Sequence, residues 1–282
     1  RAWQVAGAAA GGASLFGGGL AIGRLLRLDS QRGDYRKAWE NHNLATLERL
    51  RQLDEHPEGE RPYLIVSLGD SSVQGVGASR VTESYPARLA SAIAAQMDRE
   101  VLLLNLSLSG ATIESVELTQ IPQMIGLGLL DGPYSPDLVT LTIGGNDVMT
   151  EDMAPGQFEE RLRRVLAALP ANALVSTIPS FGIMPQESRA QDMSDRIAAA
   201  VSDSDADVVD LRSLTQEYSL PTYTFAYHAA DFFHPNSAAY TKWAQLFADA
   251  WAMSRREAAP VVEDAPQWDM LSARVAQSEY DD

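Results

Sequence analysis

The sequence contains no cysteine and has little positive charge. Zero cysteines among 282 residues exclude disulfides, thiolate nucleophiles and cysteine-ligated zinc. The chain has 22 lysines and arginines against 38 aspartates and glutamates, a formal net charge of −16. A nucleic-acid partner needs a basic surface for its phosphates, so this balance argues against nucleic acid as a partner. The same charge would repel an anionic lipid surface.

Hydrophobic residues make up 45% of the chain, which is ample for one sizeable core. Pro57, Gly59 and Pro62 interrupt regular structure, and they place the start of the main domain near residue 60. We expect the tail to be partly disordered or to lie along the surface. The predicted parts are an apolar leader (1–27), a helical linker (28–60), a main domain (61–254) and an acidic tail (255–282).

Residues 2–23 carry no charged side chain and are just long enough to cross a bilayer as a helix. Most of them are glycine and alanine, which makes insertion marginal. A membrane anchor is the favoured interpretation, ahead of a cleaved signal peptide or a soluble apolar leader. We therefore expect a membrane-associated protein rather than a secreted or cytoplasmic one. The arginines from Arg24 onward favour a cytoplasmic domain, but the side of the membrane stays open.

An amphipathic helix is predicted between Asp34 and Glu55, where large apolar residues recur near helical spacing within a charged segment. These apolar residues are Trp39, Leu44, Leu47, Leu50 and Leu53. His42 and His56 lie outside the main domain, and we expect both to be solvated.

Five apolar runs alternate with helical patterns in the main domain. The first run ends in a tight turn within 62–77, and a run that also ends in a turn lies within 137–147. The others lie at 101–106, 173–180 and 206–211. Helical patterns follow at 82–97, from Ile113, at 156–169, at 187–201 and from Ser237 to about Met253. Such alternation predicts a parallel sheet that is covered by helices on both faces.

A polar cluster follows each of the first three runs, and a fourth precedes the last helix. Ligands of open parallel sheets bind outside the carboxyl ends of the strands, so these clusters should converge on one edge. Taken singly, each cluster is more typical of a turn or a helix cap. Their joint order disfavours that explanation. The clusters are Gly-Asp-Ser-Ser at 69–72, Ser-Leu-Ser-Gly at 107–110, Gly-Gly-Asn-Asp at 144–147 and Asp-Phe-Phe-His-Pro-Asn at 231–236.

With these four blocks in this order, the chain resembles the SGNH/GDSL hydrolase superfamily of esterases and lipases over about residues 62–252. The resemblance implies a three-layer α/β/α sandwich with a parallel, flavodoxin-like sheet of about five strands. It also implies site roles for five residues. Ser71 would be the nucleophile, Asp231 and His234 would complete the triad, and the oxyanion hole would comprise Ser71, Gly110 and Asn146.

The chemistry of these residue types agrees with the implied roles. A serine hydroxyl needs a base to take its proton, and histidine suits that task near neutral pH. Asp231 could fix the tautomer of His234 and stabilise the imidazolium. Loss of one oxyanion donor typically costs about 10²–10³ in turnover, so Asn146 counts as catalytic. Ser72 is the local rival of Ser71.

The sequence thus predicts a serine esterase or lipase that needs no cofactor and acts on a small-molecule, lipid or glycan ester. An acyltransferase or deacetylase with the same site, and a catalytically silent membrane-associated binding protein, are the alternatives. A metal site of His228, Asp231 and His234 is disfavoured, because it leaves Ser71 and Asn146 unexplained. The loops at 122–136 and 180–190 carry no readable substrate code, and the oligomeric state cannot be read.

Overall fold

The computed structural model describes residues 15–55, 60–130, 132, 134–150, 152–217, 226–229 and 233–273, with side chains from residue 30 onward. Five strands form one parallel sheet in the order β2-β1-β3-β4-β5, which is the flavodoxin-like order. The predicted fold class is therefore confirmed. The strands are β1 (Tyr63–Gly69), β2 (Val101–Asn105), β3 (Leu138–Thr142), β4 (Ala173–Ser176) and β5 (Asp207–Val209).

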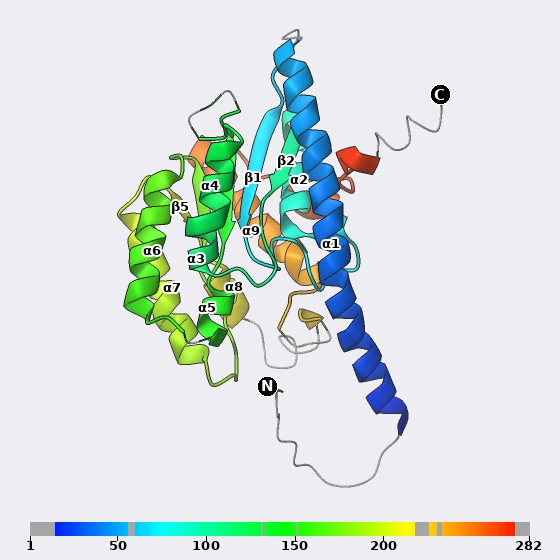
Figure 1. Ribbon diagram of the computed structural model, residues 1–282, viewed down its shortest axis with the longest axis vertical. Coiled ribbons are helices and arrows are strands. Elements are labelled where there is room, and N and C mark those ends of the chain that lie inside the picture. The colour runs from blue at the N-terminus through cyan, green and yellow to red at the C-terminus, as the bar shows by residue number, and fades with distance from the viewer. Residues whose placement is uncertain are drawn as a thin grey trace.

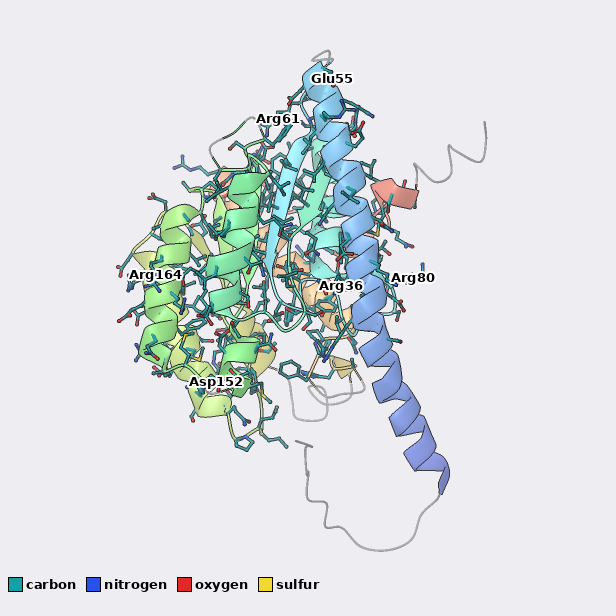
Figure 2. All side chains as sticks on the ribbon, in the orientation of Figure 1. Arg36, Glu55, Arg61, Arg80, Asp152 and Arg164 are labelled. Carbon is teal, nitrogen blue, oxygen red and sulfur yellow. The ribbon has the colours of Figure 1, made fainter. Side chains whose placement is uncertain are left out.

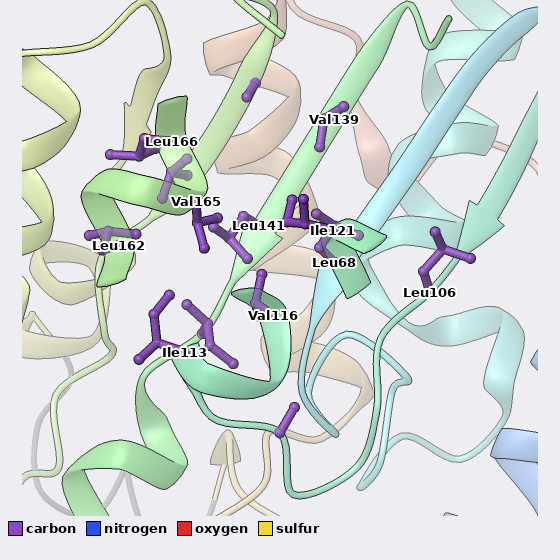
Figure 3. Packing of buried hydrophobic residues seen from close by; sticks show 14 of the residues in the cluster. Leu68, Leu106, Ile113, Val116, Ile121, Val139, Leu141, Leu162, Val165 and Leu166 are labelled. Carbon is purple, nitrogen blue, oxygen red and sulfur yellow. The ribbon is translucent and has the colours of Figure 1, made fainter. Parts of the chain in front are cut away.

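Helices cover both faces of the sheet, and two apolar clusters fill the space between the layers (Figure 1). In the first cluster, Leu68 and Leu141 of the sheet pack near Val116 and Ile121 (Figure 3). That face is covered by α3 (Ile113–Ser115), the π-helical η2 (Val116–Gln120), α4 (Ile121–Gly126), α6 (Pro155–Ala168) and α7 (Glu187–Ser202). The other face is covered by α2 (Tyr85–Met97) and α9 (Ser237–Arg255).

Four short helical elements complete the domain. They are η1 (Val81–Glu83), α5 (Gly145–Thr150), α8 (Leu211–Gln216) and η4 (Val262–Asp264). All residues of β1, β2, β3 and β4 are buried, as expected for parallel strands that are covered on both faces. Because all five strands are parallel, their carboxyl ends, and the loops that follow them, share one edge of the sheet.

The first helix, α1 (Leu15–Glu55), is one continuous helix of 41 residues that crosses the predicted boundary between leader and linker. It lies along the edge strand β2 and runs toward the amino ends of the strands, so that Glu55 lies near Arg61 and Arg36 lies toward the opposite edge (Figure 2). Its first turns extend beyond the edge that holds the strands' carboxyl ends (Figure 1). Trp39 and Leu50 are buried, whereas Leu44 is 67% exposed.

The prediction that His42 is solvated is wrong, because its side chain is only 1% exposed. The ring lies edge-on between Trp39 and Trp268, and its Nδ1 accepts a hydrogen bond from the backbone N–H of Leu271 at 3.0 Å. The tail residue Trp268 thus covers α1, and the tail to residue 273 packs against the protein. His56, the other predicted solvated histidine, lies outside the described residues.

The predicted membrane anchor at 2–23 falls partly outside the part of the chain that the structure describes. Residues 1–14 are not described, and α1 begins at Leu15. Within the described ranges, no helix combines the length and the apolar character needed to cross a bilayer. The anchor therefore stays a prediction.

Packing of α1 against the sheet can be tested with two leucines of the same helix. Leu50→Ala should lower the free energy of unfolding by about 3 kcal/mol, because it removes buried methyl groups and leaves a cavity. Leu44→Ala should change it by less than about 0.5 kcal/mol, since Leu44 points to solvent. Denaturant unfolding measures both, and equal values would contradict the packing of α1.

Candidate active site

The end of β1 is held in a conformation that only glycine adopts easily. Gly69 has a φ of +138°, and a Cβ there would lie 2.0 Å from the carbonyl oxygen of Thr142. The buried side chain of Gln120 accepts from the Gly69 N–H and donates to the Gly69 carbonyl, both at 2.8 Å. Both backbone polar groups of Gly69 are thereby satisfied by one amide, and the position of the following turn is fixed.

Ser71 and His234 are brought together by the fold. The Ser71 Oγ lies 2.9 Å from the His234 Nε2, and the two residues are 5% and 3% exposed. They line a cavity whose wall also includes the aromatic rings of Phe181, Phe233 and Trp243. The geometry gives the hydroxyl a base within hydrogen-bond reach in a mostly apolar setting.

The rival hydroxyl of Ser72 has a different partner. Its Oγ donates to the Oδ1 of Asp70 at 2.7 Å, and its backbone N–H donates to the same oxygen at 2.8 Å. Ser72 therefore closes a local turn around Asp70, whereas Ser71 contacts the imidazole.

The second and third polar clusters meet beside this turn. The backbone N–H of Leu108 donates to the Gly69 carbonyl at 3.1 Å, which joins the loop after β2 to the end of β1. The Nδ2 of Asn146 donates to the carbonyl of Ala111 at 2.8 Å, next to Gly110. An amide nitrogen has two N–H groups, so this bond leaves one more for a ligand. Ser71, Gly110, Asn146 and His234 thus all lie at the carboxyl edge of the sheet.

Asp231 lies outside the described residues. It is also one member of the alternative metal trio. His228 lies in an antiparallel bridge with Pro235, which folds the segment around His234 back on itself. Among the residues that the structure describes, no group of three histidines, cysteines or carboxylates could hold a metal ion. The trio with Asp231 remains untested.

Sequence reasoning missed the buried amides that connect the two loops. Asn105 donates from Nδ2 to the Val73 carbonyl at 3.0 Å. Gln74 donates from Nε2 to the Ser107 carbonyl at 2.8 Å, and its Oε1 accepts from the Ser109 Oγ at 2.6 Å. A possible signal was Asn105 itself, a polar residue that ends an otherwise apolar run.

Two carboxylates beside the site have raised pKa values. Burial raises the pKa of Asp70, and the hydrogen bonds from Ser72 and the nearby His234 act in the opposite direction. Burial likewise raises the pKa of Asp147 to about 6, although the carboxylate accepts the backbone N–H of Ile113 at 3.2 Å. Desolvation outweighs hydrogen bonding in both groups.

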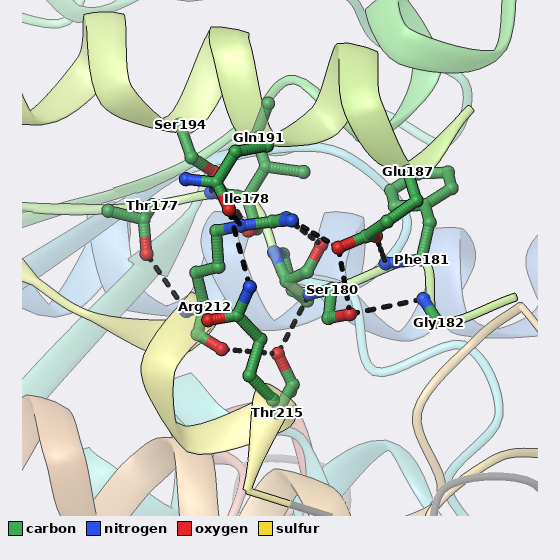
Figure 4. Close-up of polar contacts among 12 residues, drawn as sticks. Thr177, Ile178, Ser180, Phe181, Gly182, Glu187, Gln191, Ser194, Arg212 and Thr215 are labelled. Atoms are coloured by element: carbon green, nitrogen blue, oxygen red, sulfur yellow. Dashed lines mark hydrogen bonds and ion pairs between the residues drawn. The ribbon is translucent and has the colours of Figure 1, made fainter. Parts of the chain in front are cut away.

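One wall of the cavity is held by an ion pair between a buried arginine and a partly buried glutamate (Figure 4). Arg212, 4% exposed, pairs with Glu187 and donates from Nε to the Oε1 of Gln191 at 2.7 Å. Glu187 in turn accepts from the Ser180 Oγ at 3.2 Å and from the Phe181 N–H at 2.5 Å. The pair therefore fixes the backbone that brings Phe181, in the loop at 180–190, to the cavity.

Comparisons with known proteins bear on the family and the fold of the chain. Residues 67–242 match the model of the GDSL-like lipase/acylhydrolase family. No curated protein matches the sequence. The solved structures that share the fold include three with identities of 21% or less.

One of them is LAE5, an alpha/beta hydrolase enzyme from the metagenome of Lake Arreo in Spain, with 21% identity and a TM-score of 0.53 over 69% of this chain and 97% of its own. Another is Axe2, an acetylxylan esterase from Geobacillus stearothermophilus, with 18% identity and a TM-score of 0.54 over 67% of this chain and 94% of its own. The third is the lipase/acylhydrolase from Enterococcus faecalis, with 20% identity and a TM-score of 0.53 over 66% of this chain and 93% of its own.

The raised pKa of Asp147 predicts a specific pH dependence of stability. Between its ordinary pKa of 3.8 and about 6, the folded protein holds a proton that the unfolded chain has lost. The free energy of unfolding should therefore fall as the pH rises through this window. Asp147→Asn removes that titration, so its stability relative to the wild type should increase by about 2 kcal/mol from pH 4 to pH 7. Unfolding of both proteins at the two pH values tests this, and parallel pH curves would contradict it.

The ion pair that holds the cavity wall should also be costly to break. Arg212→Met leaves Glu187 partly buried without its guanidinium, and we expect a loss of about 3 kcal/mol in the free energy of unfolding. Arg36→Met, which breaks an exposed pair with Glu40, should cause no comparable loss. Denaturant unfolding of the two variants is the measurement. A similar small effect for both would show that the pair around Arg212 does not support the wall.

Proposed function

Because the chain belongs to the GDSL-like lipase/acylhydrolase family of ester-hydrolysing enzymes, we propose that it is a serine esterase that acts through an acyl-enzyme on Ser71. The observation that carries this proposal is the buried hydrogen bond between the Ser71 Oγ and the His234 Nε2, 2.9 Å long, at the wall of a cavity. A hydroxyl becomes a competent nucleophile when such a base can take its proton.

The reaction follows from this pair. The Ser71 Oγ attacks the ester carbonyl carbon while its proton passes to the His234 Nε2. The tetrahedral intermediate then breaks its bond to the alcohol, which leaves with the proton from His234. A water molecule gives a proton to His234 and attacks the acyl-enzyme, and the acid is released as the proton returns to the Ser71 Oγ. We assign the orientation of the imidazole to Asp231, on the sequence pattern.

Three donors would hold the charge that develops on the carbonyl oxygen. They are the backbone N–H groups of Ser71 and Gly110 and the side-chain amide of Asn146. The bond from Asn146 to the Ala111 carbonyl supports this role, because it restrains the amide beside the loop that carries Gly110. Donors fixed before the reaction need no reorganisation at the transition state, which is where such groups contribute most.

For the substrate, a carboxylic ester with a small acyl group, such as an acetyl ester of a glycan, is the first candidate. The support is that Axe2, a solved structure with the same fold, is an acetylxylan esterase. The aromatic rings in the cavity offer apolar surface on which an acyl group and a sugar ring could pack.

Substitution of the two neighbouring serines tests the nucleophile. Ser71→Ala should lower turnover of a nitrophenyl acetate by at least about 10³-fold, since no other hydroxyl contacts the imidazole in the described part of the chain. Ser72→Ala, the matched control, should keep activity within about tenfold, because its hydroxyl contacts Asp70. A fluorophosphonate should label the Ser71 peptide in the wild type. Full activity of Ser71→Ala, or labelling at another residue, would refute the assignment.

A further inference from the structure

The part of α1 nearest the site contacts the loop that follows Ser71 through polar side chains. Gln31, Tyr35, Trp39 and Asn43 are spaced four residues apart, so they lie along one stripe of the helix. The indole Nε1 of Trp39 donates to the Gln74 carbonyl at 3.0 Å. The Asn43 side chain both donates to and accepts from the backbone of Asn105, at 2.7 and 2.9 Å. The stripe thus binds the backbone of the loop after β1 and of the last residue of β2, where the second loop of the proposed site begins.

Gln31 makes the contact closest to the histidine. Its Oε1 accepts the backbone N–H of Gly77 at 2.9 Å, and its Nε2 donates to the carbonyl of Ala78 at 2.7 Å. The hydroxyl of Tyr35 donates to the same carbonyl at 2.9 Å. One amide therefore holds the N–H of Gly77 and the carbonyl of Ala78, which lie on either side of the peptide bond between these two residues.

Gly77 in turn lies directly against the segment that carries His234. Its φ is +98°, and a Cβ at this position would lie 2.3 Å from the Pro235 carbonyl oxygen and 3.1 Å from the His234 Cβ. The same loop is tied to the nucleophile, because the Val76 N–H donates to the Ser71 carbonyl at 3.0 Å. No free space separates Gly77 from the segment that carries His234, so a shift of Gly77 would move His234 relative to Ser71.

We propose that Gln31 is a positioning residue for the reaction: by holding Gly77 it keeps the His234 imidazole at hydrogen-bond distance from the Ser71 hydroxyl. The inference rests on the proposed serine esterase function. It extends the catalytic machinery to α1, which lies outside the residues 67–242 that match the family. A displacement of about 1 Å between reacting groups can lower a rate by up to about 10²-fold, so one lost tether is enough to matter.

The test compares variants of Gln31 with a control on the same helix. Gln31→Met keeps the length of the side chain but loses both amide hydrogen bonds. We expect its kcat, per fluorophosphonate-labelled site, to fall about tenfold while KM stays within about twofold of the wild type. Gln31→Glu keeps an acceptor for the Gly77 N–H and should retain kcat within about threefold. The control is Gln52→Met, whose side chain donates to the exposed Glu48, and it should leave kcat and KM unchanged.

The outcomes separate this inference from the proposed function. A merely structural role for Gln31 predicts fewer labelled sites and a lower melting temperature, with wild-type kcat for each labelled site, and that result would overturn the inference alone. Equal loss of kcat in Gln31→Met and Gln31→Glu would also contradict it, because the bond from Gly77 would then not be the one that matters. A wild-type protein that neither reacts with the fluorophosphonate nor cleaves esters would refute the proposed function and this inference with it.

Discussion

The hydrogen bond between Ser71 and His234 joins residues 163 positions apart, and much of the fold can be understood from what this contact requires. Ser71 follows β1, which lies inside the sheet between β2 and β3. His234 precedes α9, which packs on one face. The contact forms only if the last helix seats correctly on the sheet and the first turn leaves β1 in the right direction. The buried rings of α9, Trp243, Phe247 and Trp251, supply the apolar area for that seating.

The directions in which the loops leave the sheet edge are set by side-chain amides rather than by apolar packing. Gln120 holds Gly69, Gln74 holds Ser107, and Asn146 holds Ala111. A buried amide such as that of Gln120 or Gln74 is costly unless its groups are paired, and these amides pair with backbone groups at the end of β1 and in the loop after β2. Such bonds fix orientation where strand pairing has ended. They explain how loops after three different strands can converge on one cavity.

The sheet and the convergence of its loops could be predicted from sequence, because strand runs are local patterns and the edge rule for parallel sheets is general. The burial of His42 could not, since it depends on Trp268 and Leu271, more than two hundred residues away. For the same reason, the contacts made by the polar stripe of α1 could not be predicted from the sequence. Gln31 is an ordinary surface residue in the sequence, and only its contact with Gly77 makes it part of the site. Local propensity carries no information about such distant partners.

The choice of polar residues on α1 also has a physical rationale. Apolar burial is non-directional, so a helix that packs through leucines alone can slide or rotate at little cost. The leucines of α1 that pack against the apolar core, Leu47, Leu50 and Leu53, lie in its carboxyl-terminal half, where the helix contacts β2. Gln31 binds the loop after β1 and Asn43 binds the end of β2, at two points of α1 that are twelve residues apart, about 18 Å along the helix axis. Two directional attachments at that separation fix both the translation and the rotation of α1. The helix then forms a rigid support along the site. The loops after β1 and β2 keep their positions relative to each other because both segments are attached to this helix.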